Sequence, residues 1–152
     1  MQIESVAQMT NISSTYRSMM RNIIPYHDFI VTGDGWYPIE TYNGNTFRWV
    51  TNDAEIIIGA PSGKISKICA ELEAGPSLGR TSFMLDVLDS TGKVVAQTGV
   101  MNREAVTFDV PLRYNETAIF RLHVDSDNLP VPGDSRMMNF RVFSLGWAHL
   151  ME

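Results

Sequence analysis

The sequence has 152 residues, of which 44% are hydrophobic and 19% are charged, and its net charge is −5. This length and balance fit one domain with a hydrophobic core and exclude intrinsic disorder. The acidic charge argues against a nucleic-acid partner, because phosphate binding needs clustered basic residues and the 12 Lys and Arg are scattered.

Residues 1–26 differ from the rest and are predicted to form a short N-terminal helix or arm. Ser13 or Ser14 can act as an N-cap, and apolar residues from Met19 onward recur at helical spacing until Pro25 ends the pattern. The apolar stripe is short, so we expect this segment to lie against the following domain or a neighbouring subunit.

From residue 27 to residue 152 the pattern changes to the alternation that is typical of β-strands. Runs of β-branched and aromatic residues are separated by clusters of Gly, Pro, Asn and Asp. Nine strands are predicted, at Asp28–Thr32, Phe47–Val50, Ala54–Ile58, Ser66–Glu73, Ser82–Leu88, Lys93–Gly99, Ala105–Val110, Ala118–Val124 and Met138–Trp147. This series predicts an all-β domain, a jelly-roll-like sandwich of two antiparallel sheets.

The clearest local signals are a hairpin and an alternating strand. Gly92 lies between the apolar runs 83–88 and 93–96 and can supply the positive φ of a tight turn. Phe120 and every second residue after it are apolar, whereas Arg121 and every second residue after it are polar. This second pattern predicts one buried and one exposed face.

The last predicted strand has apolar residues on both faces. Phe140, Val142 and Ser144 are expected to point one way, and Arg141, Phe143 and Leu145 the other way. A strand that is apolar on both faces is typical of a covered, central position in a sheet. We therefore predict that this strand is central.

The cysteine count and the apolar runs limit the cellular compartment. Cys69 is the single cysteine, so no intrachain disulfide can form. The first residues lack the order of charged and apolar residues of a signal peptide, and no segment reaches the roughly 20 apolar residues of a membrane span. We expect a cytoplasmic protein without a membrane span.

Signatures of catalysis and of metal binding are absent from the sequence. His27, His123 and His149 are isolated, and neither a Gly-x-Ser-x-Gly motif nor a zinc-ligand spacing is present. The oxygen-rich segment Asp125–Asn128 has the alternate ligands of a calcium loop, but a polar turn is the preferred interpretation. The loop Leu129–Arg136 either connects two strands or borders a site. We therefore predict that the protein is not an enzyme and that it binds neither a metal ion nor a cofactor.

Sugar binding is the function for which suitable residues are present. It needs a flat aromatic face for the apolar side of the ring and polar groups for the hydroxyls, with Arg adding planar hydrogen bonds. Such residues lie in a Gly- and Pro-flanked loop and at the start of the next strand, and a hairpin would bring them together. The candidate carbohydrate-binding residues are Trp36, Tyr37, Glu40, Arg48, Asp34 and Asn43.

A structural role for the same aromatic residues stays open. An exposed Trp36 or Tyr37 would be the stacking platform for a sugar. Large aromatic residues also dominate burial in sandwich cores, and in that case Trp36, Trp49 and Trp147 fill the core with Arg48 as a polar neighbour.

Three parts of the sequence resemble a β-sandwich domain of bacterial glycosyltransferases and other proteins of surface-polysaccharide synthesis. They are Asp34–Glu40, Thr46–Val50 and the closing block formed by Val131–Arg136 and Asn139–Phe143. The resemblance extends over residues 29–147. It implies an accessory domain that is similar to carbohydrate-binding modules and usually sits beside a catalytic domain, with no catalytic residues of its own.

Two functions follow as expectations. The first is a non-catalytic accessory domain of glycan or polysaccharide synthesis that binds carbohydrate through the aromatic loop, with a glycosyltransferase domain as partner. The alternative is a structural or assembly subunit, of viral or filament type, that self-associates through residues 1–26.

Overall fold

The computed structural model describes residues 30–59 and 67–148, so the predicted N-terminal helix or arm, residues 1–26, lies outside the described residues. The strands are β1 (Ile30–Thr32), β2 (Glu40–Tyr42), β3 (Asn45–Val50), β4 (Asp53–Ile58), β5 (Lys67–Ala74), β6 (Ser82–Leu88), β7 (Val94–Met101), β8 (Arg103–Asp109), β9 (Ala118–His123) and β10 (Phe140–Trp147). In the described part of the chain, no helix has the length and hydrophobicity to cross a membrane.

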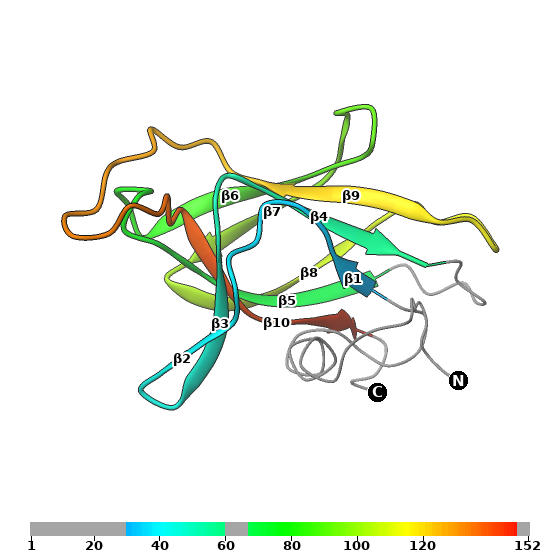
Figure 1. The fold of residues 1–152 in the computed structure, drawn as a ribbon. Coiled ribbons are helices and arrows are strands. Elements are labelled where there is room, and N and C mark those ends of the chain that lie inside the picture. The colour runs from blue at the N-terminus through cyan, green and yellow to red at the C-terminus, as the bar shows by residue number, and fades with distance from the viewer. Residues whose placement is uncertain (1–29, 60–66, 149–152) are drawn as a thin grey trace.

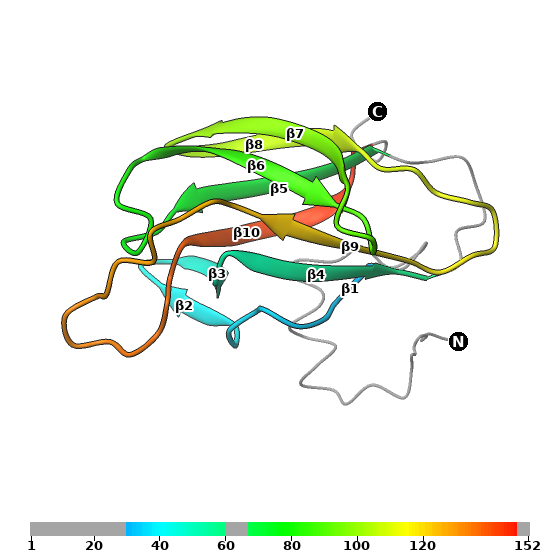
Figure 2. The ribbon, with the colours of Figure 1, turned by 90° about the horizontal axis from the view of Figure 1, so that it is seen from above.

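The strands form two antiparallel sheets of five strands each, stacked as two layers (Figures 1 and 2). The first sheet has the order β1-β4-β9-β6-β7, and the second sheet has the order β2-β3-β10-β5-β8. From β4 onward the chain crosses repeatedly between the layers. This arrangement confirms the predicted jelly-roll-like sandwich.

The core lies between the two layers because strands such as β4, β5 and β9 bury every second side chain. Ile56 on β4, Leu122 on β9 and Phe140 on β10 are fully buried. The rings of Phe83 on β6 and Phe140 are 5.7 Å apart and join the two sheets. Full burial of a large apolar side chain stabilises a fold by about 1.5 to 3 kcal/mol, so these residues hold the layers together.

The predicted hairpin at Gly92 is confirmed. Gly92 has a φ of 88° and connects β6 to β7, which pair along their length. The backbone N–H of Gly92 donates to the carbonyl of Asp89 at 2.9 Å. The Asp89 carboxylate accepts hydrogen bonds from the N–H groups of Thr91 and Lys93, so the turn is closed by side chain and backbone together.

Strand β2 was missing from the predicted series of nine. It pairs with β3 across a two-residue turn in which Asn43 has a φ of 51° and Gly44 a φ of 77°. Asn-Gly is the preferred pair for this type of hairpin turn, because both residues tolerate a positive φ. The turn of this hairpin was therefore predictable from the sequence, but β2 is polar and has no apolar alternation by which a strand could be predicted.

Strand β10 is central in the second sheet, between β3 and β5, as predicted. The expected orientations of Ser144 and Leu145 are wrong. Val142 pairs with Leu72 and Ser144 with Glu71, so Phe143 is an extra residue that forms a bulge. A bulge shifts the alternation by one residue. Ser144 is therefore exposed, and the buried positions after the bulge are Leu145 and Trp147.

The loop between β9 and β10 begins with a polar turn. Asn139 is fully buried, and its amide donates to the side-chain oxygen of Asn128 at 2.7 Å. The hydroxyl of Ser126 donates to Asn139 and accepts a hydrogen bond from the backbone N–H of Asn128 at 2.9 Å. These contacts support the interpretation of Asp125–Asn128 as a polar turn.

Candidate functional site

Trp36 and Arg48 connect the two sheets in the interior. The indole N–H of half-buried Trp36 donates to the carbonyl of Glu55 on β4 at 2.8 Å. Buried Arg48 donates to the Tyr37 carbonyl and to the Thr32 hydroxyl on β1, both at 2.8 Å, and its guanidinium lies 5.4 Å from the Trp36 ring. The sequence analysis kept a structural role for Trp36 and Arg48 as an alternative to sugar binding, and these contacts fit that role.

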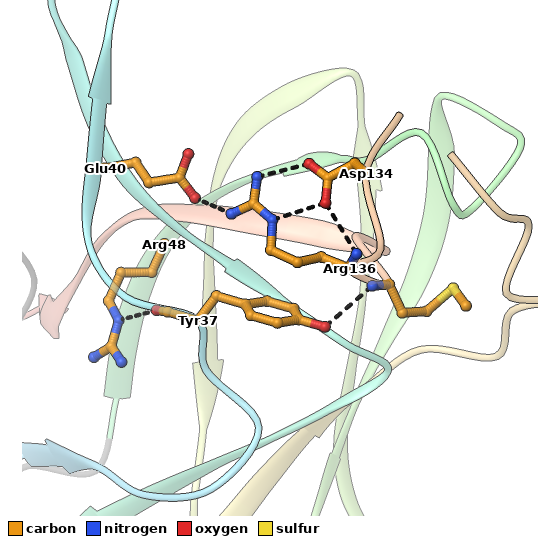
Figure 3. A network of polar contacts seen from close by, with 6 residues as sticks. Tyr37, Glu40, Arg48, Asp134 and Arg136 are labelled. Carbon is orange, nitrogen blue, oxygen red and sulfur yellow. Dashed lines mark hydrogen bonds and ion pairs between the residues drawn. The ribbon is translucent and has the colours of Figure 1, made fainter. Parts of the chain in front are cut away.

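Tyr37 and Glu40 belong to a polar network with the loop between β9 and β10 (Figure 3). The Tyr37 hydroxyl accepts a hydrogen bond from the backbone N–H of Met137 at 3.1 Å. Arg136 lies between the carboxylates of Glu40 and Asp134 and pairs with both. Its guanidinium is 5.7 Å from the Tyr37 ring. The network therefore holds the loop against the strand pair β2 and β3.

The local sequence explains why Asp134 and Arg136 meet. Gly133 has a φ of 81°, and the N–H of Asp134 donates to the Val131 carbonyl at 3.0 Å, which closes a tight turn. The Asp134 carboxylate then accepts from both the side chain and the backbone N–H of Arg136. These hydrogen bonds lower the pKa of Asp134 and raise the pKa of Arg136, so the pair is ionised throughout the neutral range.

A second arginine lies further along the outer face of the second sheet. Arg141 on β10 is 4.5 Å from the ring of Phe47 and 5.0 Å from that of Trp49, both on β3. It donates to the Glu73 carboxylate on β5 at 2.9 and 2.6 Å. Its guanidinium is therefore fixed between aromatic rings on one side of the strand and a carboxylate on the other.

A third arginine completes the row near the β8 edge. The guanidinium of Arg103 lies 3.6 Å from the ring of Phe143, the bulge residue of β10. Arg103 donates to Glu71 at 2.7 Å and to the side-chain oxygen of Asn45 at 3.1 Å. Asn45 pairs across the hairpin with Tyr42, whose side chain is 67% exposed. Asn45 is therefore the cross-strand neighbour of an exposed tyrosine and a hydrogen-bond acceptor of Arg103.

We call this surface the outer arginine face. It consists of Tyr37, Glu40, Tyr42, Asn45, Phe47, Trp49, Glu71, Glu73, Arg103, Asp134, Arg136, Arg141 and Phe143. The side chains of Arg103, Arg136 and Arg141 are 37%, 31% and 24% exposed, so solvent reaches their edges. The surface presents planar donors and acceptors whose positions are already fixed, which is what binding of a polyhydroxylated ligand needs.

The remaining two sequence candidates lie elsewhere. The backbone N–H of exposed Asp34 donates to the Glu55 carboxylate on the first sheet at 3.1 Å. Asn43 forms the tip of the β2–β3 hairpin. The structure brings only Tyr37 and Glu40 of the six candidates to the outer arginine face.

Most residues of the outer arginine face were not among the sequence candidates. The alternation of aromatic residues with arginine in Phe47–Trp49 and Phe140–Phe143 was a usable signal. Arg103 had no such signal, because its ring partner and its carboxylate come from two other strands.

A cluster of charged side chains around His123 lies on the opposite side of the molecule, on the first sheet. His123 on β9 contacts Asp53 through Nδ1 at 2.9 Å and Asp125 through Nε2 at 3.0 Å, and Arg121 is 3.6 Å from Asp53. Partial burial lowers the pKa of His123, but the hydrogen bonds to Asp125 and Asp53 outweigh this effect, and its pKa is raised above the usual 6.5. The cluster favours the doubly protonated ring.

This geometry predicts a stability that falls as the pH rises. The folded protein holds the His123 proton more tightly than the unfolded chain, whose histidine pKa is near 6.5. The stabilisation is therefore fully present below that value and is lost as the pH rises through the folded pKa. Urea unfolding between about pH 5.5 and about pH 8.5 should show this decline in the natural chain and a weaker one in His123→Gln. Parallel curves for the two proteins would rule out the proposed linkage.

A metal site is not evident in the described residues, where no group of three or more His, Cys, Asp or Glu side chains is arranged to hold an ion. His27 and His149, which the sequence analysis considered, lie outside the described residues.

Comparisons with known proteins gave similarities of fold. No protein-family model and no curated protein sequence matches this chain. It is similar to a β-1,3-glucan-binding CBM6 from Bacillus halodurans, with 14% identity, a TM-score of 0.45 and coverage of 82% of this chain and 97% of that one. It is also similar to CsCBM6-3 from Clostridium stercorarium, solved with cellobiose, with 8% identity, a TM-score of 0.46 and coverage of 77% and 85%.

A third similarity is to a larger enzyme. A glycoside hydrolase family 43 arabinoxylan arabinofuranohydrolase from Bacillus subtilis, solved with cellotetraose, has 14% identity and a TM-score of 0.42, and the match covers 83% of this chain. The match spans only 28% of the length of the hydrolase.

Proposed function

We propose that this chain is a non-catalytic carbohydrate-binding domain and that the outer arginine face is its binding surface. The observation that supports this most directly is the unit formed by Arg103, Phe143 and Glu71, which Asn45 links to exposed Tyr42 on the same hairpin. The open ring of Tyr42 offers a flat apolar surface for the C–H face of a sugar. The guanidinium of Arg103 donates to hydroxyl oxygens, while the Glu71 carboxylate accepts from hydroxyl groups.

Pre-arranged side chains reduce the entropy that binding would otherwise cost. Ordering a long side chain at an interface costs roughly 0.5 to 1.5 kcal/mol. Arg103 is already fixed by the Phe143 ring, Glu71 and Asn45, so a sugar meets it in one geometry. Arg136, at the far end of the face, is likewise fixed in one geometry by Glu40 and Asp134.

The charges of the face favour a neutral glycan. Each arginine is paired with at least one carboxylate, and the chain as a whole has a net charge of −5. A polyanionic chain would meet Glu40, Glu71 and Glu73 without a free cation to balance it. Like charges at close range weaken binding, so sulfated and uronic-acid polymers are expected to bind less well than neutral ones.

The wider role that we propose is that of an accessory domain in glycan or polysaccharide synthesis. The resemblance of Asp34–Glu40, Thr46–Val50 and the closing block to domains of bacterial glycosyltransferases supports it. This role predicts that the gene lies beside, or is continuous with, one for a glycosyltransferase domain. A coding context without such a gene would contradict this wider role and leave the binding proposal intact.

Substitutions on the face should weaken glycan binding. With neutral oligosaccharides and polysaccharides in calorimetric titration, Tyr42→Ala and Arg103→Lys should each raise the Kd at least about tenfold, which corresponds to about 1.4 kcal/mol. Lysine keeps the charge of Arg103 but loses the planar group that stacks on Phe143.

Tyr114→Ala is the matched control, because Tyr114 is another exposed tyrosine and lies in the loop between β8 and β9. It should leave the Kd unchanged. The binding proposal fails if no neutral glycan binds, or if Tyr114→Ala weakens binding while Tyr42→Ala does not.

A further inference from the structure

Strand β7 forms an open edge of the first sheet (Figure 2). Among the described strands, β6 is its only partner in that sheet, and it pairs with β6 from Val94 to Met101. In an antiparallel ladder, every second residue of an edge strand directs its N–H and C=O groups away from its single partner. The outer side of β7 is thus a row of backbone donors and acceptors. At its end, the N–H of Met101 is bound by the Glu104 carboxylate at 2.8 Å, so the groups that another strand can use are those of the residues before Met101.

The other three edges are protected against strand pairing, whereas β7 is not. Strands β1 and β2 have only three residues each. Strand β8 has seven residues but includes the charged side chains of Arg103, Glu104 and Asp109. Strand β7 has eight residues, VVAQTGVM, without a charge or a proline. Short length and charge are the usual means by which proteins block edge pairing, and β7 has neither.

The side chains of β7 leave apolar surface open at both ends of the strand. Val94 is 44% exposed and Met101 is 67% exposed. Between them, a Cβ atom added to Gly99 would meet no atom within 4 Å. Met84 on β6 pairs with Gly99 and, together with Met101, lines a hollow over this part of the sheet. The edge before Met101 thus combines unpaired backbone groups with exposed apolar side chains at both of its ends.

We propose that β7 pairs antiparallel with β7 of a second copy of this chain across a two-fold axis. The two first sheets would then form one continuous sheet. A two-fold axis at a strand edge brings the Val94 end of one strand toward the Met101 end of the other, so the exposed apolar ends cover each other. The strand has no charge, so its self-pairing opposes no like charges although each chain has a net charge of −5.

Sedimentation of the intact chain tests this pairing. The mass should rise with concentration from 17.1 kDa to twice that value. Met101→Lys or Val94→Lys places a charge at the edge and should raise the dimer dissociation constant at least about tenfold, because like charges opposite each other destabilise strand pairs. Ile119→Lys is the matched control. Ile119 is 41% exposed on β9, two strands from the edge of the same sheet, and this variant should dimerise normally.

Hydrogen exchange identifies the paired strand directly. Amides of β7 should become more protected as the concentration of the natural chain rises, and this gain should disappear in Met101→Lys. A chain that stays monomeric up to the order of 1 mM would overturn the proposal. Equal weakening by Met101→Lys and Ile119→Lys, or a gain of protection on β8 and not on β7, would overturn it too. None of these measurements uses a glycan, so the result does not depend on the proposed function.

Discussion

Phe140→Ala is expected to lower the free energy of unfolding by about 3 to 5 kcal/mol, because removing a buried phenylalanine loses its transfer energy and leaves a cavity. Phe140 is fully buried at the start of central strand β10 and pairs with Val50 on β3 and Ala74 on β5. Its ring also contacts Phe83 from the other sheet. The cavity would therefore open where three strands of the second sheet meet β6 of the first sheet.

Urea and thermal unfolding measure this loss, and the midpoint temperature should fall by roughly 10 °C for a chain of this size. Tyr114→Ala removes a comparable ring from an exposed loop position and should change the stability by less than about 0.5 kcal/mol. A loss below about 1 kcal/mol in Phe140→Ala, or equal losses in both variants, would contradict the assignment of Phe140 to the centre of the core.

Most strands could be predicted because the alternation of apolar and polar residues is a local property of the chain. Strand β6 has the predicted bounds, Ser82–Leu88, and Phe120, Leu122 and Val124 are buried as expected. The turn at Gly92 was predictable for the same reason, since a positive φ limits the choice of residue.

Features that depend on pairing between distant strands could not be predicted in this way. The bulge at Phe143 arises from the register of β10 against β5, and a one-residue shift exchanges the two faces for every later residue. The polar strand β2 is held by its pairing with β3 and had no apolar alternation of its own. In both cases, the conformation of the strand is determined by its partner strand and not by its own residues.

The candidate site shows the same limit. The sequence indicated the right residue types in Asp34–Glu40 and Phe47–Trp49, but not which side of the sheet each would face. Arg48 is on the inner face and bonds Thr32 of the other sheet, whereas Arg141 is on the outer face beside Trp49. The carboxylates of Glu71 and Glu73 reach Arg103 and Arg141 from another strand, and Glu40 reaches Arg136 from the β2–β3 hairpin, so most of the outer arginine face follows from topology.

Gly35→Ala should cost more than about 3 kcal/mol, since strain in the left-handed region adds to a backbone collision. Gly35 has a φ of 95° in the turn after β1, and a Cβ atom there would lie 1.9 Å from the carbonyl oxygen of Asp53. The segment would have to move away from β4, and the contact between the Trp36 indole and the Glu55 carbonyl would be lost.

Gly44→Ala separates the two causes of that loss. Gly44 also has a positive φ, 77°, but a Cβ atom there meets no atom within 4 Å. Its alanine variant should therefore show the conformational strain alone, about 1 to 2 kcal/mol. Unfolding in urea gives both values, and tryptophan fluorescence should change in Gly35→Ala only, since Trp36 follows Gly35 directly. Equal losses in the two variants would mean that the approach of Gly35 to β4 does not fix the Trp36 loop. That result would also contradict the role of Trp36 in connecting the two sheets.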